Sequence, residues 1–117
     1  MNEAVSDVRI CSVDDVKRGA AARFDVDGHR LCVVRLAGRD GGPDDWYVIG
    51  DECSHADYSL SEGDVWEDER EIECPKHGST FALETGEPQT LPATQPVPVY
   101  RVRVDGDDVL VEIGQVR

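Results

Sequence analysis

Four residues in two short stretches of the chain combine thiol and imidazole groups at close spacing. Cys53 and His55 stand one residue apart in C-S-H, and Cys74 and His77 stand two residues apart in C-P-K-H, after 18 intervening residues. Thiolate and neutral imidazole are common protein ligands of zinc and of the iron in iron–sulfur clusters. The four side chains therefore indicate a metal site built from two loops, each supplying one sulfur and one nitrogen.

Three interpretations of this pattern differ in chemistry. The cysteines could be buried apolar side chains and the histidines surface residues, with no metal bound. The four side chains could form a tetrahedral zinc site that stabilises the fold. They could instead hold a Rieske [2Fe-2S] cluster, in which two cysteines bind one iron and two histidines bind the other. The mixed order favours the cluster, because zinc fingers usually keep cysteine pairs and histidine pairs on separate loops.

The chain resembles Rieske-type ferredoxins, the small electron carriers of multicomponent aromatic-ring oxygenase systems. The resemblance rests on C-S-H, on L-S-E-G at 60–63, on C-P-K-H-G and on the later L-P-A-T-Q-P-V-P-V-Y, and it spans about residues 8–113. It implies one [2Fe-2S] cluster whose ligands are Cys53, His55, Cys74 and His77.

The family resemblance also implies the fold. We expect an all-β protein, a Rieske-like β-sandwich that forms a single domain over residues 1–117. A small cluster-binding subdomain is expected at about residues 51–93, and the proline-rich stretch T-L-P-A-T-Q-P is expected to pack over the cluster. One short N-terminal helix is predicted after Ser12, because S-V-D-D is a capping signature and Gly19 follows as a stop signal.

Four positions near the ligands are expected to influence the cluster. Respiratory members of the family resemble this chain at Ser79, whose hydroxyl could donate to a cluster sulfur, but they carry a tyrosine where Phe81 stands. Hydrogen bonds to cluster sulfurs stabilise the reduced state. We therefore expect a potential towards the low end of the Rieske range of about −150 to +300 mV, raised somewhat by Ser79. Leu91 and Pro92 are expected to shield the cluster from water.

Two cysteines of the respiratory branch of the family are missing from this chain, and two other cysteines lie outside the loops. Respiratory Rieske proteins carry an extra cysteine in each loop, joined as a disulfide, and Tyr58 and Lys76 occupy those places here. Cys32, inside L-C-V-V-R-L, is expected to be a core thiol. A disulfide between Cys11 and Cys32 is the alternative, which a reducing compartment disfavours.

Several turn signals predict the strands that hold the loops. Asp27-Gly28 and Asp105-Gly106-Asp107 each join two apolar-rich runs, as in tight hairpins. Further strands are expected at 46–50 and from Thr80, giving seven to nine in total. Residues 61–73 are expected to be mostly a charged excursion, and the prolines of 88–98 favour an extended loop.

Composition excludes several classes of protein. The chain has 117 residues, with 12 Lys and Arg against 25 Asp and Glu, and its formal net charge of −13 repels nucleic acid and anionic membrane surfaces. The N-terminus lacks a targeting pattern, and no apolar run approaches the roughly 18 residues of a membrane span. We expect a cytoplasmic monomer. Its acidic surface either steers it towards a basic partner or keeps it soluble.

The resemblance implies an electron carrier rather than an enzyme. A flavin- or NADH-linked reductase would supply one electron, which would pass His55 or His77 on its way to a terminal oxygenase. The residues agree, since the sequence contains no Ser/His/Asp set and no glycine-rich phosphate loop. Alternatives are a small Rieske subunit of a nitrite reductase, a ferredoxin serving iron–sulfur cluster assembly, and a structural Cys2His2 zinc module.

Overall fold

Three small antiparallel sheets make up the chain. The computed structural model describes residues 5–26, 28–38, 41–53, 58–76, 78–91 and 93–114. The first sheet has the order β1 (Val5–Ser12), β10 (Asp108–Gly114) and β9 (Val102–Asp105). The second has the order β2 (Ala20–Val26), β3 (His29–Leu36), β4 (Asp45–Gly50) and β8 (Val99–Tyr100). The third has the order β5 (Val65–Trp66), β6 (Glu71–Glu73) and β7 (Thr80–Ala82).

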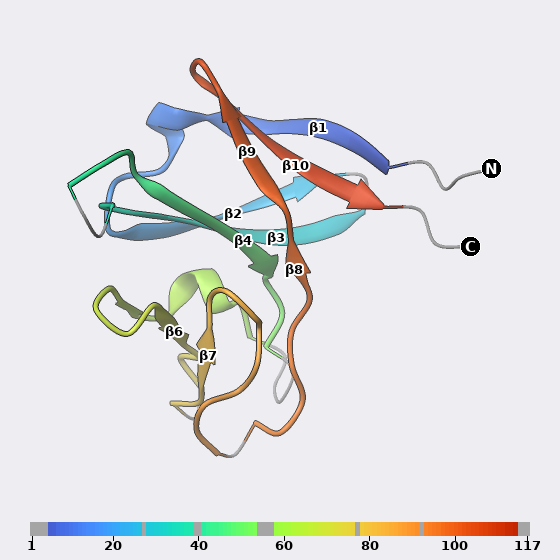
Figure 1. The fold of residues 1–117 in the computed structure, drawn as a ribbon. Coiled ribbons are helices and arrows are strands. Elements are labelled where there is room, and N and C mark those ends of the chain that lie inside the picture. The colour runs from blue at the N-terminus through green and yellow to red at the C-terminus, as the bar shows by residue number, and fades with distance from the viewer. Residues whose placement is uncertain are drawn as a thin grey trace.

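The first two sheets form a β-sandwich, and the third lies at one end of it with its long loops (Figure 1). We call residues 51–93, which include the third sheet, the small lobe. The all-β expectation is confirmed. Both predicted hairpins are also present, since β2 pairs with β3 around Gly28 and β9 pairs with β10 around Gly106. Both glycines have positive φ angles, +83° and +65°, which glycine adopts without steric cost.

Strand β3 connects the sandwich to the small lobe, because its two faces enter two different cores. Leu31 and Val33 pack with Val109 and Val111 of β10 between the two sandwich sheets. Alternate residues of a strand point to opposite faces. Cys32, Val34 and Leu36 accordingly enter a second core, which contains these lobe residues: Cys53, Leu60, Ile72, Cys74, Phe81, Leu83 and Ala93. The prediction that Cys32 is a core thiol is confirmed.

Two sequence-based expectations need correction. The predicted N-terminal helix lies at the expected place but is a 3-10 turn, η1 (Val13–Asp15), where the Ser12 N–H donates to Asp15 Oδ2 at 2.9 Å. The stretch 61–73 is more than a charged excursion, since it contains the β5–β6 hairpin. Its E-I-E run buries Ile72 in the lobe core. The strand was not predicted because the many carboxylates of this stretch are typical of an exposed loop. The described part of the chain contains no helix long and apolar enough to cross a bilayer.

A buried arginine fastens the hairpin of the third sheet to the sandwich. Arg70 is the non-glycine residue with a positive φ, +57°, among the described residues. Its guanidinium is almost fully buried, and Nη2 donates to Ala37 O and to Asp45 Oδ2, both at 3.1 Å. The Arg70 carbonyl in turn accepts from the Leu83 N–H at 2.9 Å. One residue in a disfavoured backbone conformation therefore joins β4, the hairpin turn and the segment after β7.

Candidate metal centre

The two loop cysteines lie in the same core. Cys53 follows the end of β4 and Cys74 follows β6, and both side chains are buried in the cluster of residues that also contains Leu60 and Phe81. Neither forms a disulfide. The fold therefore brings together the two thiols that the sequence predicted as ligands.

Both cysteines close their loops in the same way. The Cys53 N–H donates to Tyr58 O at 3.0 Å, and the Cys74 N–H donates to Ser79 O at 2.7 Å. Each bond joins the cysteine to the residue five positions later. In the second loop the Gly78 N–H also donates to Cys74 O at 3.1 Å, and Gly78 has a φ of +78°. The two loops are therefore closed by the same backbone hydrogen bond between their first and last residues.

The two predicted histidine ligands, His55 and His77, lie outside the described residues, as does Pro92. Within the described part of the chain, no group of three or more His, Cys, Asp or Glu side chains is gathered closely enough to hold a metal ion. The four-ligand set therefore stays a prediction. Two buried thiols on adjacent loops are the donors that the cysteine-bound iron of a Rieske cluster requires, so the described residues fit that cofactor.

The two loops contact each other at two places. Lys76 Nζ lies 5.2 Å from the centre of the Tyr58 ring, a cation–π contact between the two loops. Gly63, just after the first loop, lies against the second: a Cβ there would be 1.6 Å from Glu73 O. The loops are thus packed together by direct backbone contact as well as by one side-chain pair.

The proline-rich stretch is hydrogen-bonded to the second loop and to β7, and its packing over the cluster stays a prediction. The Ala93 N–H donates to Ser79 Oγ at 3.0 Å, and the Gln89 N–H donates to Thr80 O at 2.7 Å. Ser79 is fully buried, and because its oxygen accepts this bond, its O–H hydrogen can donate to a further acceptor. Phe81 is fully buried in β7.

Leu91 is 77% exposed, so its apolar side chain stands at the surface of the proline-rich stretch. Its predicted shielding role is untested, like that of Pro92.

The other two cysteines have a different chemistry. Burial in the sandwich, followed by the nearby Asp15 carboxylate, raises the pKa of Cys11 to about 11. Burial also raises the pKa of Cys32 above its usual range. Both are protonated thiols at neutral pH, and thiolate is the form that binds metal. They form no disulfide with each other.

Sequence reasoning missed one buried charge beside the first loop. Asp51 is fully buried, and its Oδ1 accepts from the Ser61 N–H at 2.9 Å. The one sequence feature that could have indicated its importance is its position, two residues before the first cysteine of the motif. Composition hid it, because Asp51 is one of 25 acidic residues.

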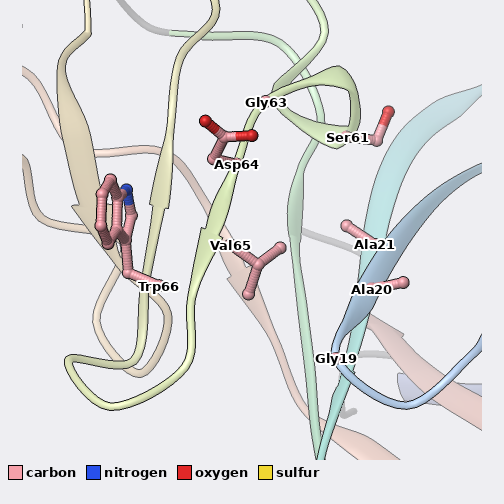
Figure 2. A pocket seen from close by; sticks show the side chains of 8 residues that line it. All are labelled: Gly19, Ala20, Ala21, Ser61, Gly63, Asp64, Val65 and Trp66. Atoms are coloured by element: carbon pink, nitrogen blue, oxygen red, sulfur yellow. The ribbon is translucent and has the colours of Figure 1, made fainter.

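A groove of about 550 Å³ lies between the start of β2 and β5 (Figure 2). Val65 points across it towards Ala20 and Ala21, whereas Asp64 and Trp66 point to the other side of β5. Among the described residues that line it, Ser61 and Asp64 have side-chain oxygen atoms.

Comparison with known proteins identifies the family. The Rieske [2Fe-2S] domain matches residues 6–101. The 3-phenylpropionate/cinnamic acid dioxygenase ferredoxin subunit of Shigella boydii serotype 4 (strain Sb227) is 39% identical over 105 residues, which cover 90% of this chain and 92% of that protein. The ferredoxin of carbazole 1,9a-dioxygenase from Nocardioides aromaticivorans IC177 is 40% identical, with a TM-score of 0.81 over 91% of this chain and 96% of that one.

A third relative is known in an assembly. It comes from the complex of reduced oxygenase and oxidized ferredoxin in carbazole 1,9a-dioxygenase, and it is 32% identical, with a TM-score of 0.77 over 95% of this chain and 97% of that one. A Rieske domain carries one [2Fe-2S] cluster, in agreement with the buried thiols of the two loops, and the family match favours this cluster over the structural zinc alternative. The chain belongs to the Rieske [2Fe-2S] domain family.

Proposed function

We propose that this protein is the ferredoxin component of an aromatic-ring dioxygenase system. It would carry one electron from a flavin- or NADH-linked reductase to a terminal oxygenase. The observation that carries the proposal is the pairing of Cys53 and Cys74 in one core on two equally closed loops, and the ferredoxin relatives support it. The protein is an electron carrier and not the catalytic component.

The residues proposed to hold the cluster are Cys53 and Cys74 on one iron and His55 and His77 on the other, within the small lobe. The cluster supplies a one-electron couple whose two oxidation states are both stable. The chain keeps both thiols away from water and fixes the loops through backbone hydrogen bonds. Fixed ligands change little in position between oxidation states, which favours rapid electron transfer.

The charge distribution supports docking at the small lobe. Residues 51–93 contain 12 of the 25 carboxylates but only two cations, Arg70 and Lys76. Arg70 is buried and bonded to Asp45, so it contributes little positive charge to the surface. A strongly acidic lobe steers a basic face of a partner towards the loops. We propose that both the reductase and the oxygenase present such a face.

A monomeric state and a cytoplasmic location complete the proposal. The net charge of −13 makes two copies repel each other, which supports the monomer. None of the four cysteines forms a disulfide, as expected for thiols in a reducing compartment. A sedimentation experiment tests the first point, and a second copy bound at micromolar concentration would overturn it.

EPR spectroscopy of the anaerobically reduced protein tests the central proposal. We expect a rhombic signal with the low average g value of a cluster with mixed cysteine and histidine ligands. A colourless, EPR-silent protein that contains zinc would overturn it.

Stopped-flow transfer to the oxidised oxygenase tests the docking surface. Raising the ionic strength from about 0.01 M to about 0.15 M shortens the Debye length from about 30 Å to about 8 Å, so the rate should fall steeply. A rate independent of salt would remove the steering role of the acidic lobe.

A further inference from the structure

Asp51 is a buried carboxylate at the base of the first cysteine loop. It is fully buried, and Arg70 and Ser79 are the other buried polar or charged residues in the described part of the chain. Removing a carboxylate from water costs several kcal/mol unless hydrogen bonds and opposite charge compensate. The bonds that hold Asp51 therefore indicate what the carboxylate stabilises.

Three hydrogen bonds place Asp51 across the two ends of the loop. Its N–H donates to Arg30 O of β3 at 2.9 Å, which fixes the outgoing end to the sandwich. Its carbonyl accepts from the Leu60 N–H at 2.6 Å, and its Oδ1 accepts from the Ser61 N–H at 2.9 Å. Leu60 and Ser61 belong to η2 (Leu60–Glu62), where the chain returns from the loop, and Figure 2 shows this turn with Ser61 beside Gly63. Asp51 thus closes the loop that carries Cys53.

In the described part of the chain, the second carboxylate oxygen has only a long contact with a cation. Oδ2 has no hydrogen-bond partner among the described residues, and the Arg23 Nε lies 4.0 Å away. That guanidinium is already bound by Asp25 through two hydrogen bonds of 2.9 and 3.1 Å. The Arg30 Nη2 donates to Ser59 Oγ at 3.4 Å. A charge in this position is screened far less than a surface charge.

We propose that Asp51 is a positioning residue for the cluster, with two separable effects. Its Oδ1 closes the first loop and so holds Cys53 in place for the iron. Its negative charge disfavours the extra electron of the reduced state and lowers the reduction potential. The inference rests on the proposed function, because it takes Cys53 as a ligand.

Two substitutions separate the two effects. Asp51→Ala removes both the acceptor and the charge, whereas Asp51→Asn keeps a carbonyl oxygen that can accept from the Ser61 N–H and removes only the charge. The matched control is Glu52→Gln, which removes a neighbouring carboxylate that is exposed to solvent. Iron content, the rate of cluster bleaching in air and the midpoint potential are measured for all three holoproteins, and urea unfolding is measured for the cluster-free forms.

We expect Asp51→Ala to lose its cluster about ten-fold faster or more, the effect of one hydrogen bond to a charged acceptor. Asp51→Asn should bleach within about two-fold of the wild type, and its potential should rise more than that of Glu52→Gln. If Asp51→Ala does not fold, the Asp51→Asn protein still tests both effects.

Wild-type bleaching in Asp51→Ala, or bleaching of Asp51→Asn as fast as Asp51→Ala, would overturn the loop-closing effect. A potential of Asp51→Asn equal to that of Glu52→Gln would overturn the charge effect. The wild-type EPR signal is independent of these results, so their failure would leave the proposed function intact.

Discussion

The two cysteine loops have the same closure but different anchors. In both, the cysteine N–H donates to the carbonyl five residues later, at 3.0 Å in the first loop and 2.7 Å in the second. The first loop is fixed to the sandwich by the Asp51 N–H, which donates to Arg30 O, and it is closed by the Asp51 carboxylate, which accepts from the Ser61 N–H. The second is fixed to the proline-rich stretch by a neutral hydroxyl, Ser79 Oγ, which accepts from the Ala93 N–H. The same closing hydrogen bond is thus supported by a carboxylate in the first loop and by a neutral hydroxyl in the second.

This difference matters because charge and hydrogen bonding act on a redox centre in opposite directions. A buried carboxylate destabilises the reduced state, whereas a hydroxyl that donates to a cluster sulfur stabilises it. The loops can therefore contribute equally to holding the cluster while contributing with opposite sign to its potential. Substitutions in each loop, with matched controls elsewhere, test whether the two loops differ in this way.

The largest expected effect is loss of the cluster when either loop loses its thiol. Cys53→Ala and Cys74→Ala should each contain almost no iron and lack visible absorption, because two thiolates bind the same iron. Cys32→Ala is the control, a buried cysteine of the same core that should cost only about 1–2 kcal/mol of stability and keep its iron. A full iron content in either loop variant would show that its loop supplies no ligand.

A smaller but still large effect is expected where the loops touch. Gly63→Ala places a methyl group 1.6 Å from Glu73 O, so one loop must shift, at a cost of about 1–3 kcal/mol. Urea unfolding and iron content should both decline. The control is Gly42→Ala, at a glycine with nothing within 4 Å of its added Cβ. Equal stability of the two variants would show that the loops can separate without cost.

An intermediate effect is expected on the reduction potential of the second loop. Ser79→Ala should lower the midpoint potential and Phe81→Tyr should raise it, each by the value of one hydrogen bond, about 1 kcal/mol or roughly 40 mV for one electron. Protein-film voltammetry measures both. Thr90→Ala removes an exposed hydroxyl that also joins the second loop to the proline-rich stretch, and it should leave the potential unchanged. A shift in Thr90→Ala as large as in Ser79→Ala would contradict the assigned role of Ser79.

The smallest effect is expected at the side-chain pair between the loops. The Lys76 ammonium lies over a Tyr58 ring that is 41% exposed, and an exposed cation–π contact contributes about 0.5–1 kcal/mol. Lys76→Ala should lower the free energy of unfolding by that amount, and the loss should vanish when Tyr58 is already replaced by Leu. Lys17→Ala, at an exposed lysine of the sandwich, is the control. Additive effects of Lys76→Ala and Tyr58→Leu would exclude a coupling between the loops.

Local sequence signals predicted most of the fold. The Asp27-Gly28 and Gly106 turns specified two hairpins because few residues other than glycine accept positive φ angles. The β6 strand was missed because its one buried residue, Ile72, stands between glutamates in a strongly acidic stretch. Three residues are too few for a period-two pattern to be distinguished from a charged loop.

Residue types and their spacing along the chain specify the chemistry of the site: which side chains can bind iron, in what order and how far apart. These are properties of residue type and short separation, and the buried pair Cys53 and Cys74 agrees with them. The packing of the sheets, in contrast, is what buries Asp51 among the many carboxylates, leaves no room for a side chain at Gly63 and brings Lys76 over the Tyr58 ring. Burial and contact between distant residues depend on how the sheets pack, because desolvation is a property of the surroundings of a group and not of its neighbours in the chain.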